Sequence, residues 1–511
     1  MYTRNGASAT GSQALPRTST TPASRVSSIG MLRIRAAWSM TAGAGWRRGA
    51  RLLLPLLCAC HEPTWPVIPP PPAAQVGRWS AYLPAPIVQL HLHLLPTGKV
   101  LSWGKYGDAQ VWDPATGVFS AVPAPSRVFC AGHDFLPDGR LLVAGGHISD
   151  LHGLPNTNVF DPATNTWQAL PPMAAGRWYP TNTTLPDGEV VTIGGTDTAG
   201  VDVTIPEVWN GTAWRQLTTA ALALPLYPRT FVAPDGRIFY AGEAQQSRYL
   251  DVSGTGQWTD GPLRQFGTRD YGSAVMYEPG KILYAGGGDP PTSTAEIIDL
   301  NQPNPTWQYT GSMAFARRQM DATLLPTGDV LVTGGTTSGG FNNPEGAVHS
   351  AELWSPTTGA WTRVAANAVT RIYHGTTLLL PDGRILHTGS GDATGAVDEL
   401  SYELYSPPYL FQGPRPTITG AVPGAVTYGQ TVVVGTPDAA AITKVTLIRF
   451  SSVTHAFDQG QRLVPLSFSP ATAAVSIALP SSRAAAPPGP YMLFLVNGAG
   501  VPSEGRILLL H

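Results

Sequence analysis

Residues 136–146 have the sequence LPDGRLLVAGG, a tight turn followed by an apolar strand that ends in two glycines. The proline restricts φ and the first glycine permits a positive φ, a combination that favours a hairpin turn. The pattern occurs seven times, at 95–104, 136–146, 185–195, 233–243, 278–288, 325–335 and 380–390. The copies recur at intervals of roughly 40–55 residues, which brackets the period of a four-stranded kelch-type blade. The repeats therefore predict a seven-bladed kelch-type β-propeller.

The two ends of the repeat array predict how the ring closes. Six repeats continue into a fourth strand that carries an aromatic residue, but none follows ELYSP at 403–407. A matching segment, GRWSAYLP at 77–84, stands unattached before the first repeat. We therefore predict that the strand around Trp79 completes the last blade, which removes open sheet edges. From about residue 415 onward, short alternating strands predict an immunoglobulin-like β-sandwich.

Composition narrows the functional classes. The chain has 511 residues and a formal net charge of -1, and its charged residues amount to only 13%. This balance gives no electrostatic basis for a nucleic-acid partner. The expected organisation is all-β, with an N-terminal extension and export signal at 1–60, a proline-rich linker at 61–76, the propeller at 77–412 and the sandwich at 413–511. We expect a monomer.

The N-terminal segment has the form of a secretory signal. Three arginines at 47, 48 and 51 precede the apolar run Leu52–Leu57, which is too short to span a bilayer. Leu57–Cys60 resembles a bacterial lipobox, so a lipid anchor through Cys60 is expected. The start of translation, Met1 or Met40, stays open. Export is predicted, either to the extracellular space or to a membrane-anchored position at the bacterial cell surface or periplasm.

One position of the repeat gathers residues capable of chemistry. Six residues before the start of each turn, in the strand expected nearest the propeller axis, the chain has Cys130, Tyr179 and His374, with Tyr373 beside the last. The equivalent residues in the other repeats are Gln89, Tyr227, Gly272 and Gln319. The repeat itself therefore does not demand Cys, Tyr or His. Taken singly, each of these residues is also compatible with ordinary core packing.

Four segments together resemble the signature segments of the galactose oxidase and glyoxal oxidase family of copper radical oxidases. They are FCAG at 129–132, RWYPT at 177–181, RIYHGTTLLLPDGR at 371–384 and TLIRFSSVTHAFDQGQRLVPL at 446–466. The RWY motif is more similar to the glyoxal oxidase branch. The resemblance covers the propeller and the sandwich in the same order.

The resemblance implies a cofactor made by the protein itself. Cys130 would be joined through sulfur to the ring of Tyr179, the radical-bearing residue. Cu(II) would be held by Tyr179, Tyr373, His374 and His455, donors that suit a tetragonal copper site, and Tyr373 would act as general base. The implied reaction oxidises primary alcohols, aldehydes or glycan ends with O₂ and releases H₂O₂. Because His455 lies in the sandwich, a hairpin of that domain is expected to enter the central channel.

Some features depart from the family pattern. The segment Ile193–Gly200 lacks the tryptophan that covers the cross-linked tyrosine in galactose oxidase. By strand alternation, Trp178 is predicted to point away from Tyr179. Arg269 or Tyr271 is expected to line the substrate pocket. Other histidines, at the surface or behind the site, are His91, His93, His133 and His147.

The alternative function is a secreted, non-catalytic kelch propeller that binds glycan or protein. Propellers have many functions, so the fold does not decide between a binding module and an oxidase. The set Cys130, Tyr179, Tyr373, His374 and His455 favours the oxidase, since a binding module has no need of it.

Overall fold

The computed structural model describes residues 71–106, 108–393 and 396–511. The predicted export signal and the candidate lipid site at Cys60 lie outside these residues. The described part of the chain belongs to a single compact unit, and the domain boundaries proposed above stay predictions. No helix of the described residues is both long and apolar enough to cross a membrane.

The second blade shows how each repeat folds. The turn glycine Gly139 has φ 86 and joins β7 (Gly132–Phe135) to β8 (Leu141–Ala144). The chain continues through β11 (Thr157–Asp161) to β12 (Thr166–Leu170), and the four strands form one antiparallel sheet. Both inner strands are completely buried, whereas the outermost strand is largely exposed. β8 is a continuous apolar run because neighbouring blades cover both of its faces. The equally buried β7 contains His133 and Asp134, whose side chains are hydrogen-bonded.

Six further sheets in the described residues repeat this arrangement. The first blade contains β3 (His91–Leu94), β4 (Val100–Trp103), β5 (Gln110–Trp112) and β6 (Phe119–Ala121). The third contains β13 (Thr181–Thr184), β14 (Val190–Ile193), β15 (Glu207–Trp209) and β16 (Trp214–Gln216). The fourth contains β17 (Arg229–Val232), β18 (Ile238–Gly242), β19 (Gln246–Asp251) and β20 (Gln257–Leu263).

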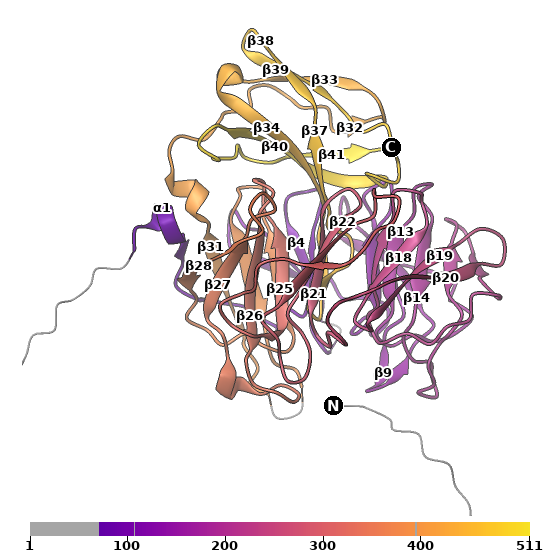
Figure 1. Cartoon of the computed structure of the whole chain (residues 1–511). Helices are drawn as coiled ribbons and strands as arrows, with labels where there is room; N and C mark the ends of the chain where they lie inside the picture. Colours follow the sequence, from indigo (N-terminus) through magenta and orange to yellow (C-terminus); the bar gives the residue numbers. More distant parts are fainter. Residues whose placement is uncertain (1–70, 107, 394–395) are drawn as a thin grey trace, which may run out of the picture. The chain divides into compact units, whose positions relative to one another are not determined.

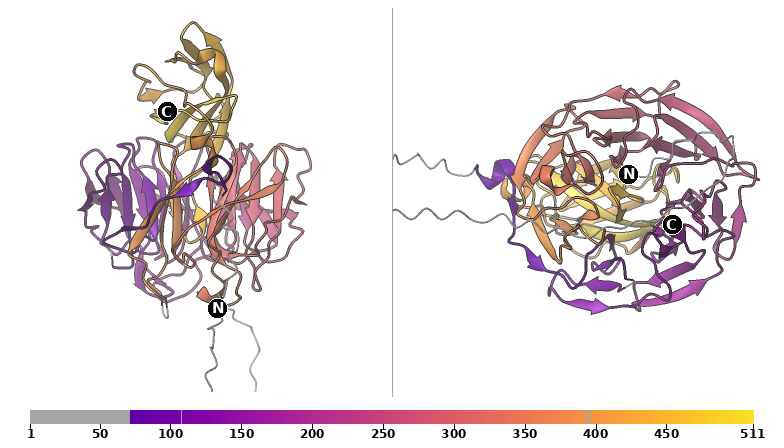
Figure 2. Two further views of the ribbon diagram at one scale, coloured as in Figure 1. Left: turned by 90° about the vertical axis from the view of Figure 1, so that its left-hand side faces the viewer. Right: turned by 90° about the horizontal axis from the view of Figure 1, so that it is seen from below.

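The remaining blades complete the ring, which is seen along its channel in the right panel of Figure 2. The fifth contains β21 (Ser273–Glu278), β22 (Lys281–Ala285), β23 (Ala295–Asp299) and β24 (Gln308–Tyr309). The sixth contains β25 (Arg318–Leu324), β26 (Val330–Thr336), β27 (Ser350–Trp354) and β28 (Trp361–Ala366). The seventh contains β29 (Gly375–Leu379), β30 (Ile385–Gly389) and β31 (Ser401–Ser406). Short elements outside the blades are α1 (Ala73–Val76), η1 (Pro344–Gly346), η2 (Pro408–Phe411) and the ribbon of β9 (His147–Ser149) with β10 (His152–Gly153).

The N-terminal strand closes the ring as predicted. β1 (Arg78–Trp79) and β2 (Leu83–Pro84) both pair antiparallel with β31. Trp79 lies opposite Tyr405, and its indole N–H donates to the carbonyl of Ala365 in the sixth blade. The outer strand of the seventh blade therefore comes from the other end of the propeller sequence, which leaves that edge paired.

The C-terminal residues form a two-sheet sandwich. One sheet contains β32 (Ala425–Val426), β34 (Ile442–Arg449), β37 (Leu463–Leu466), β40 (Gly489–Asn497) and β41 (Arg506–Leu510). The other contains β33 (Thr431–Gly435), β38 (Phe468–Ala471) and β39 (Ala474–Ala478), and η3 (Ala439–Ala441) lies between β33 and β34. Apolar side chains from both sheets form a core separate from that of the propeller.

A hairpin of the sandwich enters the propeller channel, as the sequence predicts. β35 (Ser452–Thr454) pairs antiparallel with β3, the innermost strand of the first blade, and β36 (Phe457–Asp458) pairs with β35. Figure 1 shows this yellow segment descending among the blades. Residues 450–462 are all buried. The hairpin therefore extends a propeller sheet, which fixes its depth and direction.

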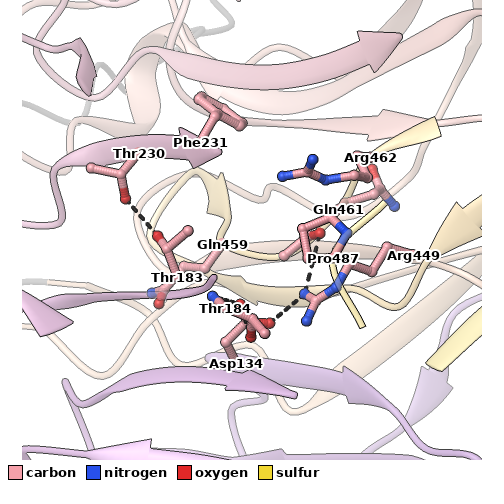
Figure 3. Close-up of a pocket in the computed structure, with 11 residues that line it drawn as sticks. Asp134, Thr183, Thr184, Thr230, Phe231, Arg449, Gln459, Gln461, Arg462 and Pro487 are labelled. Atoms are coloured by element: carbon pink, nitrogen blue, oxygen red, sulfur yellow. Dashed lines mark hydrogen bonds and ion pairs between the residues drawn. The ribbon is translucent and has the colours of Figure 1, made fainter. Parts of the chain in front are cut away.

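Polar contacts fasten the hairpin where it enters the channel (Figure 3). Arg449 donates to the carboxylate of Asp134 at 2.5 Å, and the same carboxylate accepts the N–H and hydroxyl of Thr184, each at 2.8 Å. The side-chain carbonyl of Gln459 accepts the backbone N–H of His133 and of Asn182. A cavity of ≈ 10 Å³ beside these groups is about the size of one water molecule. These buried pairs link the sandwich to the second and third blades.

Candidate metal centre

The chemistry-bearing residues stand on left-handed backbone. Cys130, Tyr179 and His374 have φ of 60, 62 and 68. Each lies one or two residues before a strand, namely β7, β13 or β29. This corrects the prediction that they lie within the innermost strands. The backbone N–H of Tyr179 donates to the carbonyl of Cys130 at 2.9 Å. Non-glycine residues adopt positive φ only at a cost, so the surrounding blades hold these side chains in a strained orientation around the channel.

Tyr271 occupies the ring position of the fifth blade, where the sequence analysis had placed Gly272. The turn there, at Pro279–Gly280, is one residue shorter than the Pro-Asp-Gly turns. Counting back from the turn glycine, instead of from the start of the turn, leads to Tyr271, whose φ is 53. Its ring lies edge-on to Tyr373 at 5.7 Å. The turn glycine is thus the better marker, and Tyr271 belongs to the site as one of the two expected candidates.

Four predicted ligands converge from the third blade, the seventh blade and the channel hairpin. The phenol oxygens of Tyr179 and Tyr373 lie 2.5 Å apart. The rings of His374 and His455 are 4.5 Å apart and nearly perpendicular, and His455 lies 4.4 Å from the ring of Tyr179. The side chains of all four are almost completely buried. Residues separated by up to 276 positions (455 − 179) are therefore brought together by ring closure and by the hairpin.

Cys130 and Tyr179 lie in one small buried cluster with Trp178, Phe129 and Tyr227. Burial raises the pKa of the Cys130 thiol well above its ordinary value, and a hydrogen bond with the Tyr179 side chain partly opposes that rise. Cys130 is the one free cysteine among the described residues. The thiol is therefore protonated and in contact with the phenol to which the sequence analysis expects it to be joined.

The rings of His374 and His455 are each held through one nitrogen. Nδ1 of His374 donates to the carbonyl of Gly391 at 2.6 Å, and Nδ1 of His455 bonds with the hydroxyl of Thr454 at 2.5 Å. Their Nε2 atoms are buried and have no partner among the described residues. Burial lowers the pKa of His374 to about 3 and lowers that of His455, so both rings are neutral. A neutral imidazole oriented through its other nitrogen is the usual metal-binding form.

The phenols complete a nitrogen and oxygen donor set. Burial raises the pKa of both Tyr179 and Tyr373 well above the ordinary value, so both are protonated in the absence of a cation. A bound metal ion reverses this balance by favouring the phenolate. No group of three or more His, Cys, Asp or Glu side chains in the described residues is arranged to hold a metal. The oxygen donors beside the two imidazoles are therefore the phenols of Tyr179 and Tyr373, and two imidazoles with phenolates suit Cu(II).

Trp178 covers Tyr179, which corrects the prediction that it points away. The two rings are stacked, with centroids 3.6 Å apart and planes 11° apart. Strand alternation fails here because Tyr179 has a positive φ and lies outside any strand. Adjacent side chains therefore reach the same side of the backbone. Trp178 thus provides the aromatic cover that the segment Ile193–Gly200 lacks.

The histidines at 91, 93, 133 and 147 were expected either at the surface or behind the site. All four are buried, so none lies at the surface. His91 Nε2 accepts the backbone N–H of Cys130 at 3.2 Å. His91 Nδ1 lies 2.9 Å from His133 Nε2, and His133 Nδ1 lies 2.7 Å from the hydroxyl of Ser452 on the hairpin. A chain of hydrogen bonds therefore connects the peptide of Cys130 to the hairpin that carries His455.

Arg269, the other expected pocket residue, does not have a free cation. It is completely buried and ion-paired with Glu296 at 2.7 Å. Equivalent pairs, at Arg177–Glu207, Arg317–Glu352 and Arg371–Glu403, recur in other blades. Its guanidinium therefore serves blade packing. Phe341, which the sequence analysis did not select, packs on Tyr373 at 4.4 Å and is 39% exposed, so it borders the site on the solvent side.

Two protein-family models match this chain, one over the propeller and one over the sandwich. A model described as glyoxal oxidase N-terminus matches residues 96–277 and 285–409. A model described as galactose oxidase-like, Early set domain matches residues 415–510. The two matches cover the propeller and the sandwich, respectively, in the order that the sequence analysis expects.

Individual relatives agree with the family models. A galactose oxidase of Gibberella zeae is 30% identical over 84% of this chain and 70% of its own length. An aldehyde oxidase GLOX of Vitis pseudoreticulata is 31% identical over 81% of this chain and 88% of its own length. A solved structure of a fungal alcohol oxidase of the AA5 family, in complex with copper, has a TM-score of 0.79 and 27% identity over 85% of this chain and 100% of its own. The chain therefore belongs to the galactose oxidase and glyoxal oxidase family of copper radical oxidases.

Proposed function

We propose that this protein is an exported copper radical oxidase that oxidises primary alcohols or aldehydes with O₂ and releases H₂O₂. The observation that carries the proposal is the convergence of two unpaired imidazole Nε2 atoms with a pair of phenols 2.5 Å apart. Cys130 lies beside one of these phenols. Buried polar atoms without partners are costly, and here the copper ion would satisfy them.

The proposed ligands are His374 and His455 through Nε2, and Tyr179 and Tyr373 through their phenol oxygens. When bound, copper would supply a Lewis acid and a one-electron acceptor beside the tyrosines. The proposed thioether joins Cys130 Sγ to a ring carbon of Tyr179. Its formation removes the thiol hydrogen and one ring hydrogen, and two electrons and two protons pass to O₂ to give H₂O₂.

Tyr373 is the proposed general base. Burial raises its pKa, so a Tyr373 phenolate in this environment binds a proton strongly and would take the one from the substrate hydroxyl. The oxidised Tyr179 would then remove a hydrogen atom from the adjacent carbon. Overall, R–CH₂OH and O₂ become R–CHO and H₂O₂, which balances atoms and electrons. An aldehyde would enter as its hydrate, which has the same hydroxyl and C–H groups.

Phe341 and Tyr271 border Tyr373 on the side from which a substrate would approach. Each of these two rings makes an edge-to-face contact with the ring of Tyr373. The proposed substrate is a small alcohol, an aldehyde or a glycan end, which would reach Tyr373 past these two rings.

Intact mass of the protein after treatment with copper and O₂ tests the proposal. The wild-type chain should lose the mass of two hydrogen atoms, and Cys130 should then resist alkylation. Cys130→Ser, a matched control that replaces the sulfur with oxygen, should keep its mass. Peroxide detection over a panel of alcohols and aldehydes should give a signal only with the cross-linked protein. An unchanged mass together with a freely alkylated Cys130 would contradict the oxidase assignment.

A further inference from the structure

Trp178 is fixed by contacts on its backbone and its side chain. Its backbone N–H donates to the carbonyl of Thr196 at 2.8 Å, and its carbonyl accepts the N–H of Thr196 at 3.0 Å. Its ring lies on Tyr179, and its indole Nε1–H donates to Nδ1 of His147 at 3.0 Å. The backbone contacts set where the side chain begins, but they leave its torsions free. The indole N–H also lies close enough to the Cys130 thiol to affect its pKa, but the bond to His147 Nδ1 at 3.0 Å ties the plane of the indole to a residue outside the cluster of Cys130 and Tyr179.

The geometry defines the state of His147. An indole N–H is a donor only, so Nδ1 of His147 must accept, and the ring proton of the neutral form is on Nε2. The side chain is 4% exposed, its ring packs on Phe129 at 5.0 Å, and its backbone N–H donates to Arg127 at 3.0 Å. Burial lowers its pKa to about 4. The acceptor is therefore available at neutral pH and is held at the first residue of β9.

Rotation of the indole would change the surroundings of Tyr179. The stacked ring covers one face of the phenol and excludes water from it, and its electron-rich face lies against a ring that becomes electron-poor on oxidation. An acceptor on the indole N–H also polarises the indole toward greater electron density. Both effects depend on the indole staying parallel to Tyr179.

We propose that His147 is a positioning residue that holds the indole of Trp178 over Tyr179, and that this sets the one-electron potential and the lifetime of the oxidised Tyr179. The inference rests on the proposed function and adds to it a residue that belongs to neither the copper ligands nor the thioether. His147 acts only through Trp178.

The test compares His147→Leu, which removes the acceptor at similar volume, with His147→Asn, whose carbonyl takes the place of Nδ1. Each is also made in a Trp178→Phe background. A first measurement needs no copper: the ¹⁵N–¹H signal of the Trp178 indole, assigned with Trp178→Phe, should move toward the free-indole position in His147→Leu and stay near its wild-type position in His147→Asn. This shows whether the hydrogen bond exists.

The second measurement uses copper-loaded protein whose cross-link is verified by intact mass. The potential is obtained by titration with the hexacyanoferrate couple, and the lifetime from the decay of the oxidised absorption without substrate. Loss of one buried hydrogen bond corresponds to about fivefold, so His147→Leu should shorten the half-life about fivefold and shift the potential. His147→Asn should restore both values, and His147→Leu should add nothing in the Trp178→Phe background.

The outcomes separate the two levels of the argument. A wild-type potential and half-life in His147→Leu would overturn this inference alone, as would an effect of equal size in the Trp178→Phe background. A wild-type protein that forms no cross-link would overturn the proposed function and this inference together. If His147→Leu does not fold, His147→Gln, whose carbonyl lies near the position of Nε2, replaces it in the same comparison.

Discussion

Lowering the pH from 7 to 5 should destabilise the copper-free protein, and His133 allows one contribution to be isolated. Burial lowers the pKa of His133 from 6.5 to about 3. Both ring nitrogens are engaged, one with His91 at 2.9 Å and the other with Ser452 at 2.7 Å. Protonation of His133 would therefore introduce a buried charge. It would also break the bond to His91, because His133 Nε2, which accepts the hydrogen of His91 Nδ1, would then carry a hydrogen of its own.

The sign and the size of the His133 contribution to the free energy of unfolding follow from the linkage between proton binding and folding. Between the two pKa values the unfolded chain binds a proton that the folded chain does not, so the free energy of unfolding rises with pH. The contribution of His133 is complete above the unfolded pKa of 6.5 and is lost as the pH falls toward about 3. At pH 5 the loss covers about 1.5 pH units, which at about 1.36 kcal/mol per unit gives about 2 kcal/mol. Burial lowers the pKa of His91 and His93 as well, so they add in the same direction.

Urea unfolding of the wild-type protein and of His133→Asn at both pH values measures this contribution. Asparagine keeps a polar group near Nδ1 but does not gain a proton. The variant should be less stable at pH 7, because the N–H of His91 loses its acceptor. On going to pH 5 it should lose about 2 kcal/mol less than the wild type does. Equal losses in the two proteins would refute the reasoning.

Three further predictions concern the ligands, the ring closure and the cross-link. His455→Ala should weaken Cu(II) binding at least about 100-fold by calorimetry, since it removes one of the two imidazole Nε2 atoms that the proposed copper site uses; unchanged affinity would remove His455 from the ligand set. Trp79→Ala should lower the free energy of unfolding by about 2–3 kcal/mol, because the indole packs on Tyr405 at 4.8 Å in the closing blade; a wild-type urea midpoint would contradict this. His91→Leu should slow thioether formation about fivefold in a mass time course, since the N–H of Cys130 loses its acceptor; a wild-type rate would show that this bond does not orient the cysteine.

The repeat turns determined most of the fold in advance. Each turn needs a glycine at positive φ, as at Gly139 and Gly188, and this local requirement is visible in any copy of the repeat. The seven copies define the number of blades, and the unattached strand at Trp79 defines the closure, because an unpaired edge is unfavourable. Cys130, Tyr179 and His374 stand out for a similar reason, because they occupy one phase of a repeat whose other copies have different residues. The predicted ligand roles, and His455 itself, came from the resemblance to the family.

The failures occurred where local periodicity stops applying. Trp178 was assigned to the wrong side because alternation assumes an extended backbone, and Tyr179 is left-handed. Tyr271 was displaced by one position because a shorter turn shifts a count made from its first residue. The first error comes from a backbone conformation that the packing of neighbouring blades stabilises. The second comes from the length of a turn, which is visible in the sequence itself.

The sequence alone therefore determined the blades and the sandwich, because these depend on turn chemistry and on strand patterning. The candidate ligands were predicted from the sequence through motifs that resemble those of the family. Only the tertiary structure decided which side chains meet. The hydrogen bonds from Cys130 through His91 to His133, and from Trp178 to His147, join segments whose spacing carries no period. Such contacts depend on left-handed residues that the closed ring holds in place, and no local rule of sequence specifies them.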